Sequence, residues 1–343
     1  MGIRSLCAIA LVLAMAAAGH ATPFTGLVIF GDSLSDPGNN AIAFGSTASP
    51  PFKVTAASDI TSNAFIPTYP YASSYQYSNG DVWAYQFATR LGLPSQVAGP
   101  VLGGGLGANY AFGGATTGPQ GGGGFPPTLL TQTADYIASL GAASAPADAL
   151  YVVAGGGNNA RAALIAVAGG ADPATTIATT AAQFAADIGA IVDALQGKGA
   201  QDIVVWNLPD IGLAPAIAAS GPTTATLATT MARAMNDALA FRLTSEVRVR
   251  TFDFFSLVTS VNADPGAYGL VNTSDAAGAI PGADPSQYLN WDGLHPTSAG
   301  HAILAEAMVV VVVPEPSGYV TILAAAVVLA VGRRAFAVTC PGA

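Results

Sequence analysis

Short apolar runs alternate along this chain with longer segments in which apolar residues recur at helical spacing. The run at residues 27–30 shows no polar alternation and is too short for a helix, which is typical of a strand buried on both faces of a parallel sheet. The predicted strands are residues 27–30, 149–154, 202–207 and 249–255. The predicted helices are residues 81–91, 131–140, 176–195, 224–247 and the segment from Thr297 onward. Because strands and helices alternate, we predict an α/β fold with helices on both faces of a parallel sheet, in a single domain.

A serine follows the first predicted strand directly, in the segment Gly31-Asp32-Ser33. In open α/β sheets the reactive crevice lies at the carboxyl ends of the strands, so Ser33 is placed where a rigid scaffold can present it to a substrate. Ser33 is therefore a candidate nucleophile. The alternative is that these residue types only form a turn, which they favour for local reasons.

A serine nucleophile needs a base, and histidine is the usual one near neutral pH. The sequence contains only His20, His295 and His301, and His20 lies in an apolar N-terminal segment. His295 lies in a predicted loop three residues after Asp292, whose carboxylate could accept the imidazole N–H and stabilise the imidazolium. His301 falls on the last predicted helix, where we expect a packed or surface role. The alternative for His295 is an ordinary loop or capping histidine.

Two further segments bear on ligand binding. The pair Gly113-Gly114 has the glycine content of a backbone that approaches a ligand closely, whereas the spacing does not fit a dinucleotide fingerprint. Residues 37–80 form a predicted long loop with several tyrosines, which either line a substrate groove or pack among themselves. These tyrosines are Tyr69, Tyr71, Tyr75 and Tyr77.

The composition is 51% hydrophobic and only 9% charged, with a net charge of −9. The chain has no basic run, so we expect no nucleic-acid partner. Both cysteines, Cys7 and Cys340, lie in the end segments, and we expect neither a disulfide nor a structural metal site in the domain between those ends.

The N-terminal segment has the parts of a secretory signal peptide. Arg4 precedes an apolar run over residues 7–18, and small residues lead to a predicted cleavage after Ala21. A membrane-anchoring helix is the alternative, but the run is shorter than the roughly 20 residues that a span requires. We therefore predict a signal peptide over residues 1–21 and export across the inner membrane.

The C-terminal segment, residues 314–343, resembles the Pro-Glu-Pro sorting signal of exported bacterial proteins. Pro314-Glu315-Pro316 is followed by an apolar stretch to Gly332 and then by Arg333-Arg334. The resemblance implies a transient membrane anchor, a partner in the sorting and processing machinery of the inner membrane, and a final location outside the cell or on its surface. A permanent anchor is the alternative.

Residues 28–308 resemble the GDSL family of the SGNH hydrolase superfamily, which comprises secreted esterases and lipases. Four segments carry the resemblance in the family's order, and they are residues 31–36, 109–115, 156–159 and 292–295. The resemblance implies a flavodoxin-like, three-layer α/β/α fold over a domain of residues 22–313. Two positions depart from the family pattern: Asn159 stands where an aspartate is usual, and Ala154 stands where a bulky residue is usual.

The resemblance also implies the roles of the site residues. Ser33 would attack an ester carbonyl, His295 would carry its proton, and Asp292 would orient His295. The oxyanion hole would consist of the backbone N–H groups of Ser33 and Gly114 and the side-chain amide of Asn158. No cofactor or metal is implied, and the expected substrate is a small-molecule, lipid or acylated-sugar ester. The alternatives are acyl transfer to a sugar or lipid, and a surface or matrix protein that binds without turnover.

Overall fold

The computed structural model describes residues 24–43, 76–102, 107–119 and 124–313. The predicted signal peptide, the sorting signal, and Tyr69, Tyr71 and Tyr75 lie outside the described residues. The centre of the fold is a parallel sheet of four strands in the order β1-β2-β3-β4. The strands are β1 (Gly26–Gly31), β2 (Ala149–Ala154), β3 (Asp202–Trp206) and β4 (Val249–Phe252). The predicted α/β fold with a parallel sheet is confirmed.

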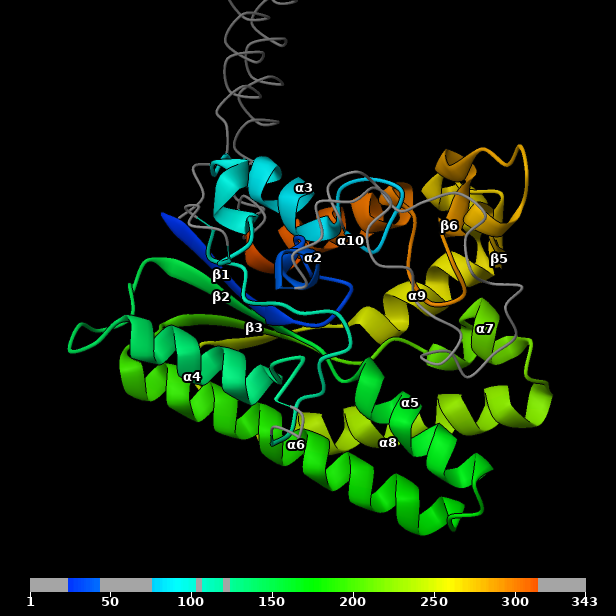
Figure 1. The fold of residues 1–343 in the computed structure, drawn as a ribbon, viewed down its shortest axis with the longest axis horizontal. Coiled ribbons are helices and arrows are strands. Elements are labelled where there is room, and N and C mark those ends of the chain that lie inside the picture. The colour runs from blue at the N-terminus through cyan, green and yellow to red at the C-terminus, as the bar shows by residue number, and fades with distance from the viewer. Residues whose placement is uncertain (1–23, 44–75, 103–106, 120–123, 314–343) are drawn as a thin grey trace, which may run out of the picture.

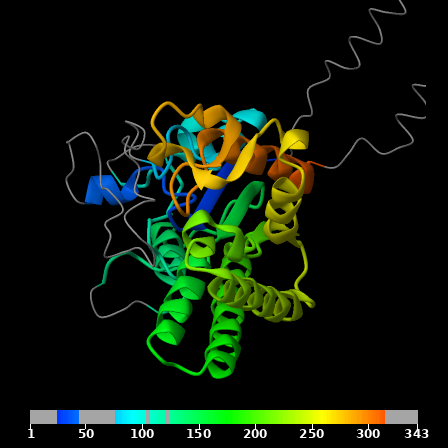
Figure 2. The same cartoon turned by 90° about the vertical axis from the view of Figure 1, so that its right-hand side faces the viewer.

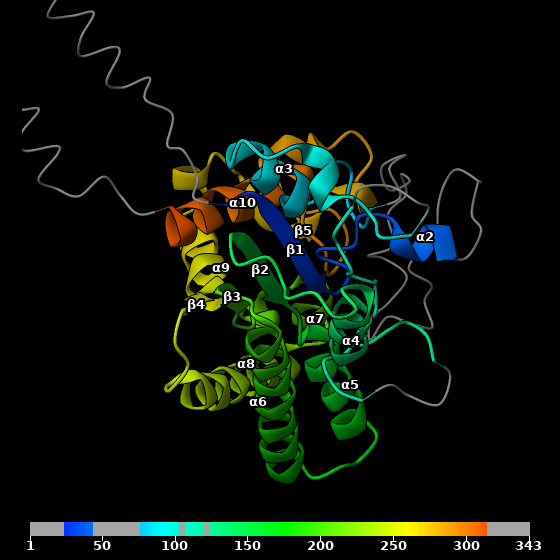
Figure 3. The same ribbon diagram turned by 90° about the vertical axis from the view of Figure 1, so that its left-hand side faces the viewer.

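Helices cover both faces of this sheet, because successive side chains of each buried strand point to opposite faces. Helices α3 (Trp83–Arg90) and α10 (Ser298–Val312) pack on one face. On the other face lie α4 (Leu129–Ser139), α5 (Gly157–Ala168), α6 (Pro173–Lys198) and α8 (Pro222–Leu243). Figures 1 and 3 show the resulting layers, with α3 and α10 on one side of the strands and α6 and α8 on the other.

Several element predictions need correction. The predicted loop over residues 37–80 contains helix α2 (Asn39–Ala43), and the helix predicted over residues 224–247 ends at Leu243. The fourth strand ends at Phe252 rather than at residue 255, because the side chain of Asp253 accepts a hydrogen bond from the N–H of Ser256 and begins helix α9 (Phe254–Ala263). Helix α5 is not among the predicted helices, because its first residues, Gly157-Asn158-Asn159, are typical of a turn. The glycine- and asparagine-rich segment after β2 is therefore in part the first turn of a helix.

Smaller elements complete the chain. Between β3 and α8 lie a 3₁₀ turn, η4 (Ile211–Leu213), and helix α7 (Pro215–Ala218). A second, two-stranded sheet, β5 (Asn272–Ala276) with β6 (Tyr288–Asn290), precedes the loop that carries His295. Figure 2 shows β5 and β6, in yellow and orange, gathered on the α10 side of the main sheet. The remaining short helices are α2 (Asn39–Ala43), η3 (Ser95–Ala98), η5 (Pro265–Tyr268), η6 (Ala277–Ala279) and η7 (Pro285–Gln287).

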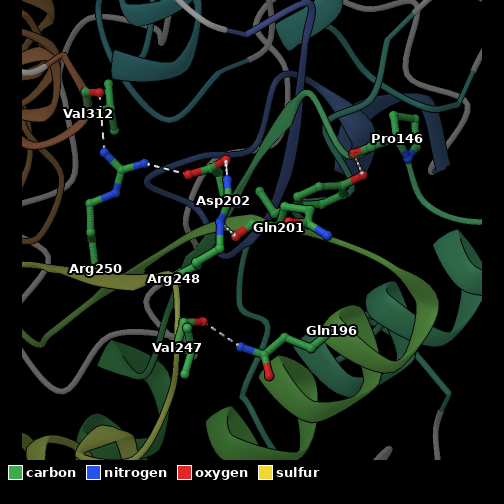
Figure 4. A network of polar contacts seen from close by, with 9 residues as sticks. Pro146, Gln196, Gln201, Asp202, Val247, Arg248, Arg250 and Val312 are labelled. Carbon is green, nitrogen blue, oxygen red and sulfur yellow. Dashed lines mark hydrogen bonds and ion pairs between the residues drawn. The ribbon is translucent and has the colours of Figure 1, made fainter.

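A polar network fixes the end of α10 to the strands (Figure 4). Arg250 on β4 donates hydrogen bonds to the carbonyl oxygens of Val311 and Val312, both at 3.2 Å. The same guanidinium contacts the carboxylate of Asp202 at 2.9 Å, and Arg248 contacts the other oxygen of that carboxylate at 2.7 Å. Arg250 thereby satisfies carbonyl groups that the end of a helix leaves without intrahelical partners.

Within the described ranges, no helix has both the length and the apolar character needed to cross a membrane.

Candidate active site

Ser33, His295 and Asp292 lie in hydrogen-bond contact. The Oγ atom of Ser33, two residues after β1, is 2.8 Å from Nε2 of His295. The other ring nitrogen of His295, Nδ1, is 2.7 Å from Oδ2 of Asp292. If Nδ1 donates to the carboxylate, Nε2 is left as the acceptor of the serine proton. The structure thus brings the predicted Ser33 into contact with the predicted pair Asp292 and His295, which follow it by more than 250 positions in the sequence.

The loop of His295 is fixed by the same aspartate. Oδ1 of Asp292 accepts hydrogen bonds from the backbone N–H groups of Leu294 and His295, each at 2.7 Å. Burial lowers the pKa of His295, but the charge and the hydrogen bond of Asp292, together with the charge of Asp32, outweigh burial, and the net effect raises this pKa above 6.5. Asp292 therefore holds both the backbone and the ring in place and favours the imidazolium.

Asp32 is a second carboxylate beside His295, and the sequence did not single it out. It is buried in the pocket wall, and Oδ1 accepts a hydrogen bond from the N–H of Leu34 at 3.1 Å. Burial raises the pKa of Asp32 to about 6. The charge of Asp32 also raises the pKa of His295, so this residue contributes to the electrostatics of the base.

Gly114 has the backbone conformation expected of a glycine whose backbone approaches a ligand closely. Its φ angle is +83°, in the left-handed region that residues with a side chain rarely adopt. Gly114 and Ser33 line the same pocket. Within the part of the chain that the structure describes, neither backbone N–H makes a hydrogen bond, so both are available to a ligand oxygen.

A network of hydrogen bonds holds Gly113, the residue before Gly114. The carboxylate of Asp36 accepts a hydrogen bond from the N–H of Gly113 at 2.8 Å, and the amide of Asn40 donates to the Gly113 carbonyl at 3.0 Å. Asp36 also accepts from the N–H groups of Gly38 and Asn39. These contacts join the turn after Ser33 to the loop of Gly114.

Asn158 and Asn159, in the first turn of α5, hold the other end of that loop. The amide of Asn158 donates to the carbonyl of Ala115 at 2.9 Å. Asn159 accepts from the N–H of Thr117 and donates to its hydroxyl, each at 3.0 Å, and this hydroxyl donates to Asp187 on α6. Asn159 stands where the family pattern has an aspartate, and an aspartate could not donate the hydrogen bond that Asn159 gives to the Thr117 hydroxyl.

Gln132 on α4 holds the end of strand β1, two residues before the serine. Its side-chain oxygen accepts from the N–H of Gly31, and its side-chain nitrogen donates to the Gly31 carbonyl, both at 2.9 Å. The nitrogen also donates to the carbonyl of Pro127 at 3.0 Å. Gln132 is buried, and no sequence signal pointed to it, because its partners are backbone atoms far away in the sequence.

A pocket of about 390 Å³ opens beside Ser33. Its walls include Gly114, Asn158 and His295, together with apolar side chains from α9 and α10. Tyr77 also lines the pocket, with its ring centre 5.3 Å from that of His295. Of the four tyrosines expected in a groove or in a self-packed loop, Tyr77 is therefore placed in the pocket, against His295.

His301 takes the packed position that was expected. It is fully buried on α10, and burial lowers its pKa to about 3, so the ring is neutral. Among the described residues, no group of three His, Cys, Asp or Glu side chains is arranged to hold a metal ion.

In this α/β fold, a serine that follows the first parallel strand contacts a histidine, and the histidine contacts an aspartate. This arrangement defines the class of a serine hydrolase site. The chain belongs to the GDSL-like lipase/acylhydrolase family, whose model matches residues 27–308. A curated relative from Pseudomonas putida, the "uncharacterized protein in trpE-trpG intergenic region", is 27% identical over 337 residues. The match covers 88% of this chain and 50% of that protein, so the chain spans about half the length of this relative.

Among solved structures, the chain is similar to a member of the lipolytic protein G-D-S-L family from Veillonella parvula DSM 2008. The sequence identity is 11% and the TM-score is 0.43, with 83% of this chain and 96% of the other chain covered.

Proposed function

We propose that this protein is a serine ester hydrolase that cleaves carboxylic esters through an acyl-serine intermediate. The observation that carries the proposal is the chain of contacts from Ser33 Oγ to His295 Nε2 and from His295 Nδ1 to Asp292. Nε2 takes the hydroxyl proton while Oγ forms a bond to the ester carbonyl carbon, and the carbonyl oxygen becomes an oxyanion.

The oxyanion is stabilised by the N–H groups of Ser33 and Gly114 and by the amide of Asn158. When the carbonyl re-forms, the bond to the alkoxy oxygen breaks, and the imidazolium of His295 gives its proton to the departing alcohol. Water then attacks the acyl-serine, His295 takes a proton from it, and a carboxylic acid leaves as Ser33 regains its hydrogen.

We also propose that the protein is exported and that its mature domain spans residues 22–313. The proposal rests on the signal-like segment at residues 1–21 and on the sorting-like segment at residues 314–343. The N-terminal residue and the intact mass of the protein recovered from outside the cell test this proposal. A mature chain that begins at Thr22 supports export, whereas a chain that keeps residues 1–21 and stays in the cytoplasm contradicts it.

The hydrolytic activity is tested with p-nitrophenyl acetate, comparing the wild-type chain with Ser33→Ala. The expected result is release of p-nitrophenol by the wild type and a loss of at least about 10³-fold in Ser33→Ala, because the nucleophile is gone. Equal thermal unfolding temperatures would show that both proteins are folded. Equal rates in the two folded proteins would contradict the role of Ser33, and product release only with an added sugar or lipid acceptor would point to acyl transfer.

A further inference from the structure

The pocket beside Ser33 extends well beyond the catalytic contacts. It passes over residues that follow three strands, including Gly155 after β2, Asn207 after β3 and Phe254 after β4. It therefore lies above the carboxyl ends of the sheet, where the chemistry of an α/β fold is placed. A group attached to the carbonyl at Ser33 can therefore extend along these strand ends.

Two apolar walls flank this path. One wall is formed by α9, β6 and α10, and its side chains include Val258, Val261 and Ile303. The second wall comes from α5, η4 and α7, with Leu164 and Ile217. Val261 and Ile217 belong to different hydrophobic clusters of the fold, so the pocket is bordered by two separately packed surfaces.

Arg161 and several other polar residues also line the pocket. Four of these side chains are bonded to the protein. Asn207 donates to Asp253 at 2.9 Å and accepts from the N–H of Phe255. The amides of Asn262 and Asn290 each donate to a backbone carbonyl, at 2.9 Å and 2.8 Å. Asp210 accepts from the N–H of Gly212 and from the hydroxyl of Thr229. Each of these four side chains is held by at least one bond to the protein, whereas a sugar needs several hydrogen-bonding groups directed into the pocket.

We propose that this pocket binds the apolar acyl chain of the ester substrate and that Val258 is a specificity-determining residue on its wall. The inference rests on the proposed hydrolytic function. The leaving alcohol and the incoming water must each reach Nε2 of His295, so their side of the carbonyl has to exchange with solvent. The acyl chain stays attached to Ser33 throughout, and a pocket with mostly apolar walls suits the group that stays.

Chain length should then control the rate. Each methylene that enters the pocket raises kcat/KM by about fourfold, because that is the effect of burying one CH₂. The rise ends where the pocket is full. We measure kcat/KM of the full-length wild-type chain for p-nitrophenyl esters from acetate upward, and for acetate esters of alcohols of increasing length. The acyl series should rise and then level off, while the alcohol series stays flat.

Val258→Phe and Thr259→Phe form a matched pair of variants on α9. Val258 lines the pocket, whereas the neighbouring Thr259 is exposed and does not. Val258→Phe should shift the optimum to shorter chains and lower the ratio of long-chain to acetate kcat/KM by about fourfold for each methylene displaced. Thr259→Phe should keep the wild-type profile. A rise along the alcohol series, flat profiles in both series, or an unchanged profile in a folded Val258→Phe would overturn the inference.

Binding to Ser33→Ala separates this inference from the proposed function. Tryptophan fluorescence follows the binding of the same p-nitrophenyl esters without turnover, because Trp206 lines the pocket. Affinity that rises with acyl length, combined with no hydrolysis by the wild type, would leave the pocket assignment standing and reject the hydrolase. Affinity that does not change with acyl length would reject the pocket assignment, whatever the activity.

Discussion

The amide nitrogen of Asn158 carries two hydrogens, and only one of them is needed for the bond to Ala115. The second can serve the oxyanion, so the bond to Ala115 orients the proposed donor. Asn158→Ala should lower kcat by about 10²- to 10³-fold, the usual effect of losing one oxyanion donor. The measurement is kcat on p-nitrophenyl acetate, with Asn272→Ala in β5 as a control outside the pocket. Turnover like that of the wild type in Asn158→Ala would remove Asn158 from the proposed oxyanion hole.

The acid limb of the pH profile reports on His295, which must be neutral to accept the serine proton. Asp292 and Asp32 raise the pKa of His295, whereas burial and Arg161 lower it, and the net shift is upward. The kcat/KM of the wild type should therefore fall as pH decreases through a value above 6.5. Asp292→Asn removes a negative charge that raises the pKa of His295, so the acid limb of the profile should move to lower pH. We also expect kcat to drop by about 10⁴-fold. A wild-type limb below 6.5, or a limb that Asp292→Asn leaves in place, would contradict this account.

At the scale of elements, the contact of α4 with β1 gives a test of how the serine is positioned. Gln132→Met keeps the approximate volume of the side chain but removes its bonds to Gly31 and Pro127. We expect the free energy of unfolding to fall by about 1–3 kcal/mol, because buried polar backbone groups lose their partners. We also expect kcat to fall more than KM changes, because the turn that carries Ser33 loses its support.

Gln287→Met on η7 is the matched control, because Gln287 is exposed and contacts Asp284. Chemical denaturation and steady-state kinetics give both readouts for the two variants. If Gln132→Met is destabilised with no change in kcat, Gln132 supports only the fold and does not position the nucleophile.

The elements themselves differ in how far the sequence determines them. The strands could be predicted because a strand buried between two helix layers must be apolar throughout, as β2 is from Ala149 to Ala154. Helix α5 could not, since Gly157-Asn158-Asn159 favours a turn locally. Its start is fixed instead by tertiary contacts, such as the bonds of Asn159 to Thr117.

For the whole molecule, the reactive residues were predictable and their surroundings were not. Ser33 and His295 stand out because few residue types can act as nucleophile or base, and because both lie beside predicted elements. Asp32 and Gln132 act through contacts that only the folded chain creates. The pocket wall likewise depends on ordinary apolar residues such as Val258 and Ile303, whose positions along the sequence carry no chemical signal.

The central claim is that Ser33, activated by His295, forms the covalent intermediate. The most direct measurement is mass spectrometry of the protein after reaction with a p-nitrophenyl phosphonate, which leaves a stable phosphonyl group on an activated serine as p-nitrophenol departs. The account predicts one phosphonyl group per chain, on Ser33, with labelling slowed strongly in a folded His295→Ala variant. A label on another residue, or Ser33 labelled at the same rate without His295, would contradict the account.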